Sequence, residues 1–163
     1  MTTARQVMEA QVSPLTGGYW CSVHDGDQRA LALLKEHYSY RRRASGQPRG
    51  SPTFIGAGEK IVLLTLDCLA LFGWHKATVK RYSGEEGISC TVFRNTGPVL
   101  SSTLISEADE LAWVRWPEES RHFTYVNARK IQSTNPGYCF KQAGWHTCGV
   151  SKGGLVILER VRP

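Results

Sequence analysis

The chain has 163 residues, of which 41% are hydrophobic and 10% aromatic, so it is long enough for one sizeable core and too short for two comfortable domains. Twenty basic residues against 14 acidic ones give a net charge of +6, which favours a polyanionic partner. No apolar run reaches the roughly 20 residues that a membrane helix needs, and the N-terminal residues lack the pattern of a signal peptide. We expect one intracellular domain over residues 1–163, with residues 1–18 as an arm that can stay mobile.

The cysteines indicate neither a disulfide framework nor a zinc ribbon. Their number is odd, and no pair has the C-x-x-C spacing. We therefore expect free thiols at Cys21, Cys68, Cys90, Cys139 and Cys148. No ligand spacing indicates a metal site, and the motifs of serine hydrolases, P-loop nucleotide triphosphatases, zinc proteases and zinc deaminases are absent.

The N-terminal third contains a predicted strand at residues 19–23 and a predicted helix. Either Asp25 or Asp27 can cap this helix, and its apolar face consists of Ala30, Leu31, Leu33, Leu34 and Tyr38. The helix ends near residues 37–40, before a loop rich in glycine and proline. That loop carries Arg41, Arg42, Arg43 and Arg49 without an intervening acid. A basic loop is either a solvated surface or a contact for nucleic acid, and the charge favours the second interpretation.

The middle of the chain predicts three strands and a helix. Apolar residues at 60–66, 70–75 and 88–93, separated by turns, predict an antiparallel meander at the centre of the sheet. A helix follows over residues 102–115, with Ser101, Ser102 or Thr103 as its cap. A helix that starts directly after a strand is a natural position for an anion.

The C-terminal third predicts a strand, a short helix and a hairpin. The strand covers residues 123–126. Asn135 and Pro136 are suited to begin the short helix, and Gly144 is suited to end it in the left-handed conformation. One further strand begins at Trp145, and another over residues 155–159 pairs with it across the turn at 151–154.

This order of elements resembles the GNAT acyltransferase superfamily and, within it, the Mom-like DNA-modification proteins of bacteriophages. The resemblance is carried by five motifs between about residues 36 and 159: His-Tyr-Ser at 37–39, Phe-Arg-Asn at 93–95, Phe-Thr-Tyr-Val at 123–126, Asn-Pro-Gly-Tyr at 135–138 and Ala-Gly-Trp at 143–145. It implies an α/β fold with a single mixed, mostly antiparallel sheet, splayed open at its centre and flanked by helices.

The resemblance also implies a donor site after the fourth strand of the fold. GNAT enzymes present a Gln/Arg-x-x-Gly-x-Gly/Ala loop there, whose backbone N–H groups hold the pyrophosphate of acyl-CoA. This chain reads Arg-Asn-Thr-Gly-Pro-Val at 94–99, which retains one glycine and loses a donor N–H at Pro98. This departure is similar to the Mom-like branch, in which the fold is retained and the donor pocket differs, so the resemblance implies either acyl-CoA or another activated acyl or glycyl compound as the donor. The residues implied in binding it are Phe93, Asn95, Ser101, Ser102 and Asn127.

Five residues are implied in catalysis: His37, Tyr38, Arg94, Tyr125 and Tyr138. Tyr138 corresponds to a tyrosine that protonates the leaving group, and Arg94 can clamp a phosphate or an acyl carbonyl through its planar guanidinium. Asn127 stands where some relatives carry an aspartate, so His37 is the substitute base. We expect His75, His122 and His146 to be structural, because each is flanked by apolar residues on a predicted strand.

The implied function is transfer of a small acyl-derived or glycine-derived group, such as carbamoylmethyl, to adenine N6 in double-stranded DNA, which protects the DNA from restriction. A stacked base cannot reach a pocket, so the target base must flip out while the basic loop holds the backbone. The residues expected to contact DNA are Ser39, Tyr40, Arg41, Arg42, Arg43 and Arg49. The protein would act in the cytoplasm of an infected bacterial host, as a monomer or homodimer.

Two alternatives remain open at this stage. One is a GNAT N-acetyltransferase that acts on a protein or small amine with acetyl-CoA. The other is a non-catalytic module that binds nucleic acid through the basic loop.

Overall fold

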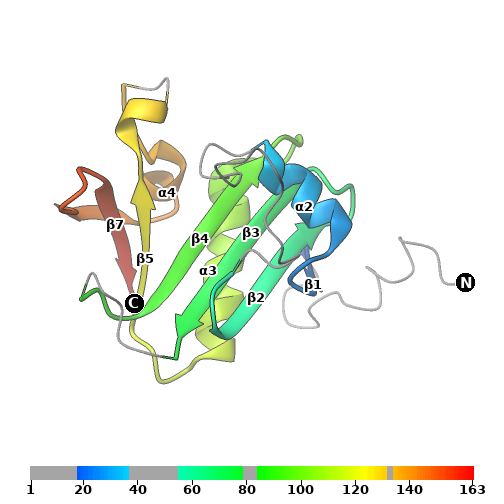
Figure 1. Cartoon of the computed structure of the whole chain (residues 1–163), viewed down its shortest axis with the longest axis horizontal. Helices are drawn as coiled ribbons and strands as arrows, with labels where there is room; N and C mark the ends of the chain where they lie inside the picture. The colour runs from blue at the N-terminus through cyan, green and yellow to red at the C-terminus, as the bar shows by residue number, and fades with distance from the viewer. Residues whose placement is uncertain (1–17, 37–54, 79–83, 132–133) are drawn as a thin grey trace, which may run out of the picture.

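The computed structural model describes residues 18–36, 55–78, 84–131 and 134–163, which form a seven-stranded sheet with helices on both faces (Figure 1). The elements are β1 (Trp20–Val23), α2 (Gln28–Lys35), β2 (Gly58–Thr65), β3 (Ala70–Ala77), β4 (Ile88–Asn95), α3 (Ser101–Arg115), β5 (Arg121–Val126), the 3₁₀ turn η1 (Ala128–Lys130), α4 (Tyr138–Gln142), β6 (His146–Val150) and β7 (Val156–Val161). The strand order is β1-β2-β3-β4-β5-β7-β6. Among the described strands only β4 and β5 pair in parallel, so the mixed, mostly antiparallel sheet that the resemblance implies is confirmed.

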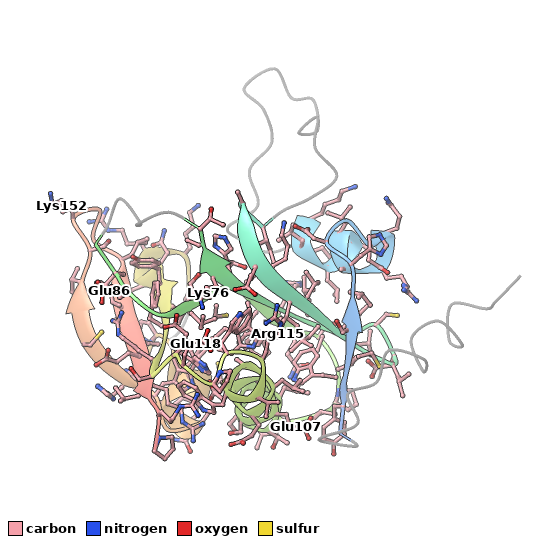
Figure 2. All side chains as sticks on the ribbon, turned by 90° about the horizontal axis from the view of Figure 1, so that it is seen from below. Lys76, Glu86, Glu107, Arg115, Glu118 and Lys152 are labelled. Atoms are coloured by element: carbon pink, nitrogen blue, oxygen red, sulfur yellow. The ribbon has the colours of Figure 1, made fainter. Side chains whose placement is uncertain are left out.

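The helices α2 and α3 lie on opposite faces of the sheet (Figure 2). On one face α2 buries Ala30, Leu33 and Leu34 against β1 to β4. On the other face α3 buries an apolar stripe, including Leu104, Ala108 and Leu111, against β3 and β4. No helix among the described residues is long and apolar enough to cross a membrane. The described cysteines are all free thiols, as predicted.

The two helix starts are settled by local geometry. Asp27 caps α2, because its carboxylate accepts hydrogen bonds from the amides of Arg29 and Ala30 at 2.9 and 3.4 Å. The prediction that Ser101, Ser102 or Thr103 caps α3 is wrong, since the N-cap is Leu100 and none of the described side chains caps this helix. The first serine is part of the helix itself, and its hydroxyl accepts a hydrogen bond from the Asn95 amide instead.

The predicted start of the short helix is also wrong. The amide of Tyr138 donates to the Asn135 carbonyl at 3.1 Å, which closes a turn over residues 135–138. Gly137 is left-handed within that turn, with φ of 76°, so α4 begins at Tyr138, after Asn135 and Pro136. The left-handed end at Gly144, with φ of 94°, and the hairpin of β6 and β7 are confirmed.

The sheet opens between β4 and β5, as the resemblance implies (Figure 1). The two strands pair only at Ile88 with His122, Ser89 with Phe123 and Cys90 with Thr124. Farther along, β4 pairs only with β3, and β5 pairs only with β7. The Thr124 hydroxyl donates to the Cys90 carbonyl at 2.9 Å where the strands separate. The carboxyl-terminal halves of two parallel strands therefore diverge at one edge of the sheet.

A β-bulge in β4 decides which side chains face each side of this opening. Gly73 lies opposite Val92 and Trp74 lies opposite Cys90, so Thr91 is the extra residue. A Cβ at Gly73 would lie 2.8 Å from the Thr91 hydroxyl, which explains the glycine. Because of the bulge, Cys90 packs into the α3-side core and Val92 into the α2-side core. The next residues alternate: Phe93 and Asn95 lie on the α3 side, and Arg94 lies on the α2 side.

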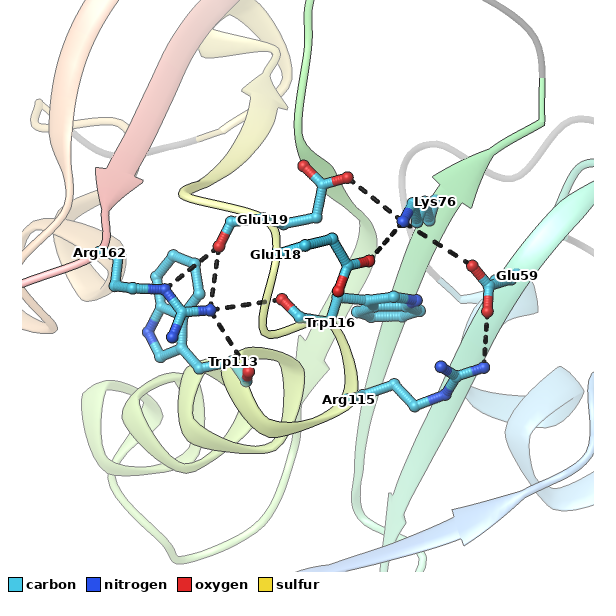
Figure 3. A network of polar contacts seen from close by, with 8 residues as sticks. All are labelled: Glu59, Lys76, Trp113, Arg115, Trp116, Glu118, Glu119 and Arg162. Atoms are coloured by element: carbon cyan, nitrogen blue, oxygen red, sulfur yellow. Dashed lines mark hydrogen bonds and ion pairs between the residues drawn. The ribbon is translucent and has the colours of Figure 1, made fainter.

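A polar network holds the other end of α3, away from the opening (Figure 3). Arg162 donates to the carbonyls of Trp113, Trp116 and Glu119 at 3.0–3.4 Å and so satisfies the end of the helix. Lys76 contacts Glu118, Glu119 and Glu59, and Glu59 also contacts Arg115. Exposed ion pairs of this kind stabilise a fold by little. The network as a whole connects the end of α3 to β2, β3 and β7.

Candidate functional site

The opening between β4 and β5 is the candidate site because the carboxyl ends of two parallel strands separate there. In open α/β sheets, ligands bind in the crevice outside the carboxyl ends of neighbouring strands. The chain leaves β4 through a short loop over residues 96–100 and enters α3 directly. The start of a 15-residue helix therefore stands at the edge of the opening.

Asn95 organises this loop from the last position of β4. Its side-chain amide donates to the Val99 carbonyl at 2.7 Å and to the Ser101 hydroxyl at 3.0 Å, while its oxygen accepts from the Gly97 amide at 3.0 Å. The amide and hydroxyl of Thr96 both donate to the Leu69 carbonyl, at 2.8 and 2.7 Å. Hydrogen bonds therefore hold the loop in one conformation and also attach it to the turn between β2 and β3.

The first amides of α3 keep their hydrogen-bonding capacity. Within the described part of the chain, no group accepts a hydrogen bond from the amides of Val99, Leu100, Ser101 or Ser102. Free amides at a helix start add to the positive end of the helix dipole and favour an anion such as a phosphate. The amides of Thr96 and Gly97 are already used, and Pro98 has none.

Arg94 lies on the opposite side of β4 from Asn95. Its Nη1 donates to the Glu36 carbonyl and its Nη2 contacts the Glu36 carboxylate, both at 3.2 Å. Its Nε is buried and has no partner among the described residues. The arginine therefore ties β4 to the end of α2. Its predicted catalytic role stays a prediction, and its guanidinium does not point at the start of α3.

The other predicted residues of the described region lie along β5 and α4. Tyr125 is half-buried on the face of β5 away from α3, with its ring 5.8 Å from that of Phe123. Tyr138 begins α4 and is 55% exposed. Asn127 caps η1 by accepting a hydrogen bond from the Arg129 amide at 3.1 Å. No ring contact or hydrogen bond joins Tyr125 to Tyr138 in the described structure, so their joint role also stays a prediction.

Comparison with known proteins identifies the fold. No protein-family model and no curated protein sequence matches the chain. A chimera and a point mutant of the spermidine N-acetyltransferase from Vibrio cholerae are similar in structure, each with a TM-score of 0.55 and 12% identity over 88% of this chain, and over 96% and 92% of theirs. The chain has a GNAT-like fold.

A further similar structure is an aminoglycoside acetyltransferase in complex with coenzyme A, with a TM-score of 0.45 and 14% identity over 63% of this chain. The chain spans 66% of that enzyme's length, slightly less than two thirds. The likeness to the spermidine N-acetyltransferase structures confirms the predicted GNAT-like architecture. The narrower likeness to the Mom-like branch stays a prediction.

The predicted sites for the base and for DNA lie outside the part of the GNAT-like fold that the structure describes. All of them fall within residues 37–54: His37, Tyr38, Ser39, Tyr40, Arg41, Arg42, Arg43 and Arg49. Among the described residues, no group of histidine, cysteine and acidic side chains is arranged to hold a metal ion.

Sequence reasoning missed a buried polar cluster beside the site. Asp109 of α3 is fully buried, and its carboxylate accepts hydrogen bonds from His122 at 2.7 Å, Trp145 at 2.9 Å and Arg160 at 2.9 Å. His122 is also fully buried and stacks on Trp113, with ring centroids 3.5 Å apart. The expectation that His122 is structural is confirmed. An acid inside the apolar stripe of a helix was the only sequence signal for this cluster.

The cluster predicts a pH dependence of stability. Burial lowers the pKa of His122 from its ordinary value of 6.5, although Asp109 opposes the shift, and Arg160 and Arg162 add to it. The unfolded chain therefore binds more protons than the folded chain below about pH 6.5, so stability is full above that pH and falls as the pH drops toward the lowered pKa. Urea unfolding at pH 7.5 and 5.5 measures this loss. We expect a smaller loss in His122→Gln, and equal losses would contradict the assignment.

Proposed function

We propose that the chain is an N-acyltransferase that transfers a small acyl group from a thioester of the coenzyme A type to an amine. The observation that carries this proposal is the opening of the parallel pair β4 and β5 beside the uncapped start of α3. A GNAT-like fold, shared with acetyltransferases, supports acyl transfer as the reaction class.

The residues at the opening fit such a donor. The free amides of Val99, Leu100, Ser101 and Ser102 would hold its phosphates. Beyond Cys90 the edge of β4 that faces β5 pairs with no strand of the described residues, so its backbone can pair with the amide groups of a pantetheine arm. Asn95 keeps the loop in shape while the donor binds.

The reaction needs a neutral amine, an electrophilic carbonyl and a proton for the leaving group. The amine nitrogen attacks the thioester carbon, the C–N bond forms and the C–S bond breaks. The nitrogen loses one proton, and the departing thiolate gains one. Tyr138 is our candidate for the second proton transfer, because it is exposed at the start of α4 beside β5. His37 is the candidate base for the first.

Two measurements on the purified chain test this function. Isothermal titration should show binding of acetyl-CoA, and a thiol-reactive dye should show release of free thiol that depends on an added amine. The amines should include a polyamine, an aminoglycoside and a lysine peptide. Folded protein that neither binds acetyl-CoA nor releases thiol with any of them would contradict the proposal.

DNA is the second candidate acceptor, favoured by the net charge of +6 and by the arginines at residues 41–49. In this proposal the acceptor amine is adenine N6 of a flipped base, the group is acyl-derived or carbamoylmethyl-like, and the product resists restriction. Nucleoside mass spectrometry of plasmid DNA from cells that express the chain should show a new adenosine adduct. An adduct that persists in Arg94→Ala would remove Arg94 from the catalytic residues. DNA binding without any adduct would favour a binding module.

A further inference from the structure

Five aromatic side chains form a closed ring on the α3 side of the sheet, next to the opening between β4 and β5. Successive ring centroids are 4.6 Å apart from Phe72 to Trp74, 6.3 Å from Trp74 to Trp145, 4.9 Å from Trp145 to Phe140, 5.9 Å from Phe140 to Phe93 and 5.6 Å from Phe93 back to Phe72. We call these five residues the aromatic cluster. Every member touches two others, so the cluster is packed on itself.

Two members of the aromatic cluster reach toward each other from opposite sides of the opening. Phe93 belongs to β4, and Phe140 belongs to α4, which follows β5. Their rings meet edge to face at 78°. Phe72 supports Phe93 from β3, and Trp145 supports Phe140 from the start of the hairpin. Phe140 is 7% exposed and Trp145 only 2%, so neither ring can swing outward without leaving the core.

Phe93 lies on the α3 side only because of the bulge at Thr91. If β4 alternated regularly from Cys90 to Phe93, without a bulge, Phe93 would lie on the opposite face from Cys90. With it, both belong to the same core as α3 and α4. The contact between Phe93 and Phe140 therefore depends on a feature that re-aims one side chain beside the opening.

The position of this contact along β4 relates it to the donor. The strands separate after Cys90, and Phe93 lies three residues farther, which is about 10 Å along a strand. Asn95 and the start of α3 follow. A donor with its phosphates at α3 and its pantetheine arm along β4 would place its acyl group between Phe93 and Cys90. There the hydrogen bond from Thr124 closes the opening, and the aromatic cluster fills the α3 side.

From this arrangement we propose that Phe93 and Phe140 restrict the donor to short acyl groups such as acetyl and propionyl. This inference rests on the proposed function and adds the class of acyl group to it. A longer chain would have to displace one of two aromatic side chains that are each held by a second ring. The cost of displacement appears as weaker binding of each longer donor.

The test uses S-alkyl-coenzyme A thioethers, which bind as donors do and cannot react. Isothermal titration with the ethyl, butyl, hexyl and octyl compounds gives affinity against chain length. For the wild type we expect affinity to fall at least about tenfold from ethyl to hexyl. For Phe93→Ala and Phe140→Ala we expect the hexyl compound to bind at least about tenfold more tightly than it binds the wild type.

Phe123→Ala is the matched control. It removes the same buried side chain from β5, on the face away from α3 and from the aromatic cluster. It should lower the melting temperature and keep the order of affinities that the wild type shows. Phe93→Leu gives the same comparison with a smaller change if Phe93→Ala does not fold.

The outcomes separate the two proposals. Equal affinity of the wild type for the ethyl and hexyl compounds would overturn the chain-length limit. So would a folded Phe93→Ala and Phe140→Ala pair that both keep the wild-type order. If no thioether and no coenzyme A binds to the folded wild type, the proposed function itself fails.

Discussion

Replacing Asp109 with alanine is expected to lower the free energy of unfolding by about 3–5 kcal/mol, the range for breaking a buried ion pair from one side. The carboxylate is fully buried and accepts hydrogen bonds from His122, Trp145 and Arg160. Its removal leaves two buried donors, on His122 and Trp145, and the partly exposed charged Arg160 without this acceptor. Urea unfolding at pH 7.5 measures the loss.

Glu110 is the matched control for Asp109. It is the next acid along α3, and it is exposed. Glu110→Ala should change the stability by no more than about 0.5 kcal/mol. If the two alanine variants unfold at the same urea concentration, the buried carboxylate contributes nothing beyond a surface acid.

Asp109 also affects the position of α3 relative to the opening between β4 and β5. Asp109 belongs to α3, and its partners belong to β5, to β7 and to the start of β6, so its hydrogen bonds join the helix to the half of the sheet beyond the opening. On the other side of the opening, α3 packs against Phe72 and Trp74 of β3. The distance between β4 and β5 therefore depends partly on Asp109, although its carboxylate does not contact the ends of these two strands that diverge.

Local signals explain how much of the fold was predictable. Strands β2, β3 and β4 are apolar runs separated by turns, and Asp67 stabilises the first turn by accepting from Thr65 and from the Leu69 amide. Gly144 ends α4 because glycine tolerates a φ of 94°. Such features act within a few residues, so a single sequence carries them.

The side of the sheet to which each side chain of the site points could not be predicted from such local signals. Simple alternation along β4 fails at Thr91, because the bulge depends on the partner strand and on the absence of a Cβ at Gly73. The bulge therefore decides which face each side chain takes: Phe93 lies on the α3 side and Arg94 on the α2 side. Likewise, the partners of Asp109 lie 13, 36 and 51 residues away. Contacts at that range follow from the assembled sheet.

The start of α3 failed as a prediction for a third reason. Three consecutive hydroxyl residues at 101–103 made a side-chain cap the natural expectation. In the structure Asn95 organises the loop instead, and the helix begins without a cap. With no side-chain cap from the described residues, the amides of Ser101 and Ser102 at the start of the helix keep their hydrogen-bonding capacity.

Replacing Ser102 with aspartate is expected to weaken the binding of acetyl-CoA about 10-fold to 100-fold, because a fixed carboxylate would face the donor's phosphates across the start of α3. The same change should not destabilise the fold. A negative charge in the first turn of a helix interacts favourably with the helix dipole, which is worth about 0.3–1 kcal/mol. Titration of acetyl-CoA and urea unfolding measure the two effects on one preparation.

Ser102→Asn separates charge from shape in this experiment, since asparagine has nearly the size of aspartate and no charge. It should bind acetyl-CoA within about threefold of the wild type, a difference of less than 1 kcal/mol. If Ser102→Asp simply disrupted the structure, the stability and the affinity for acetyl-CoA would both fall. If phosphate binds at the start of α3, Ser102→Asp should weaken binding without loss of stability, and Ser102→Asn should not. If Ser102→Asp binds acetyl-CoA as tightly as the wild type, the phosphates lie elsewhere, and the free amides at the start of α3 have another role.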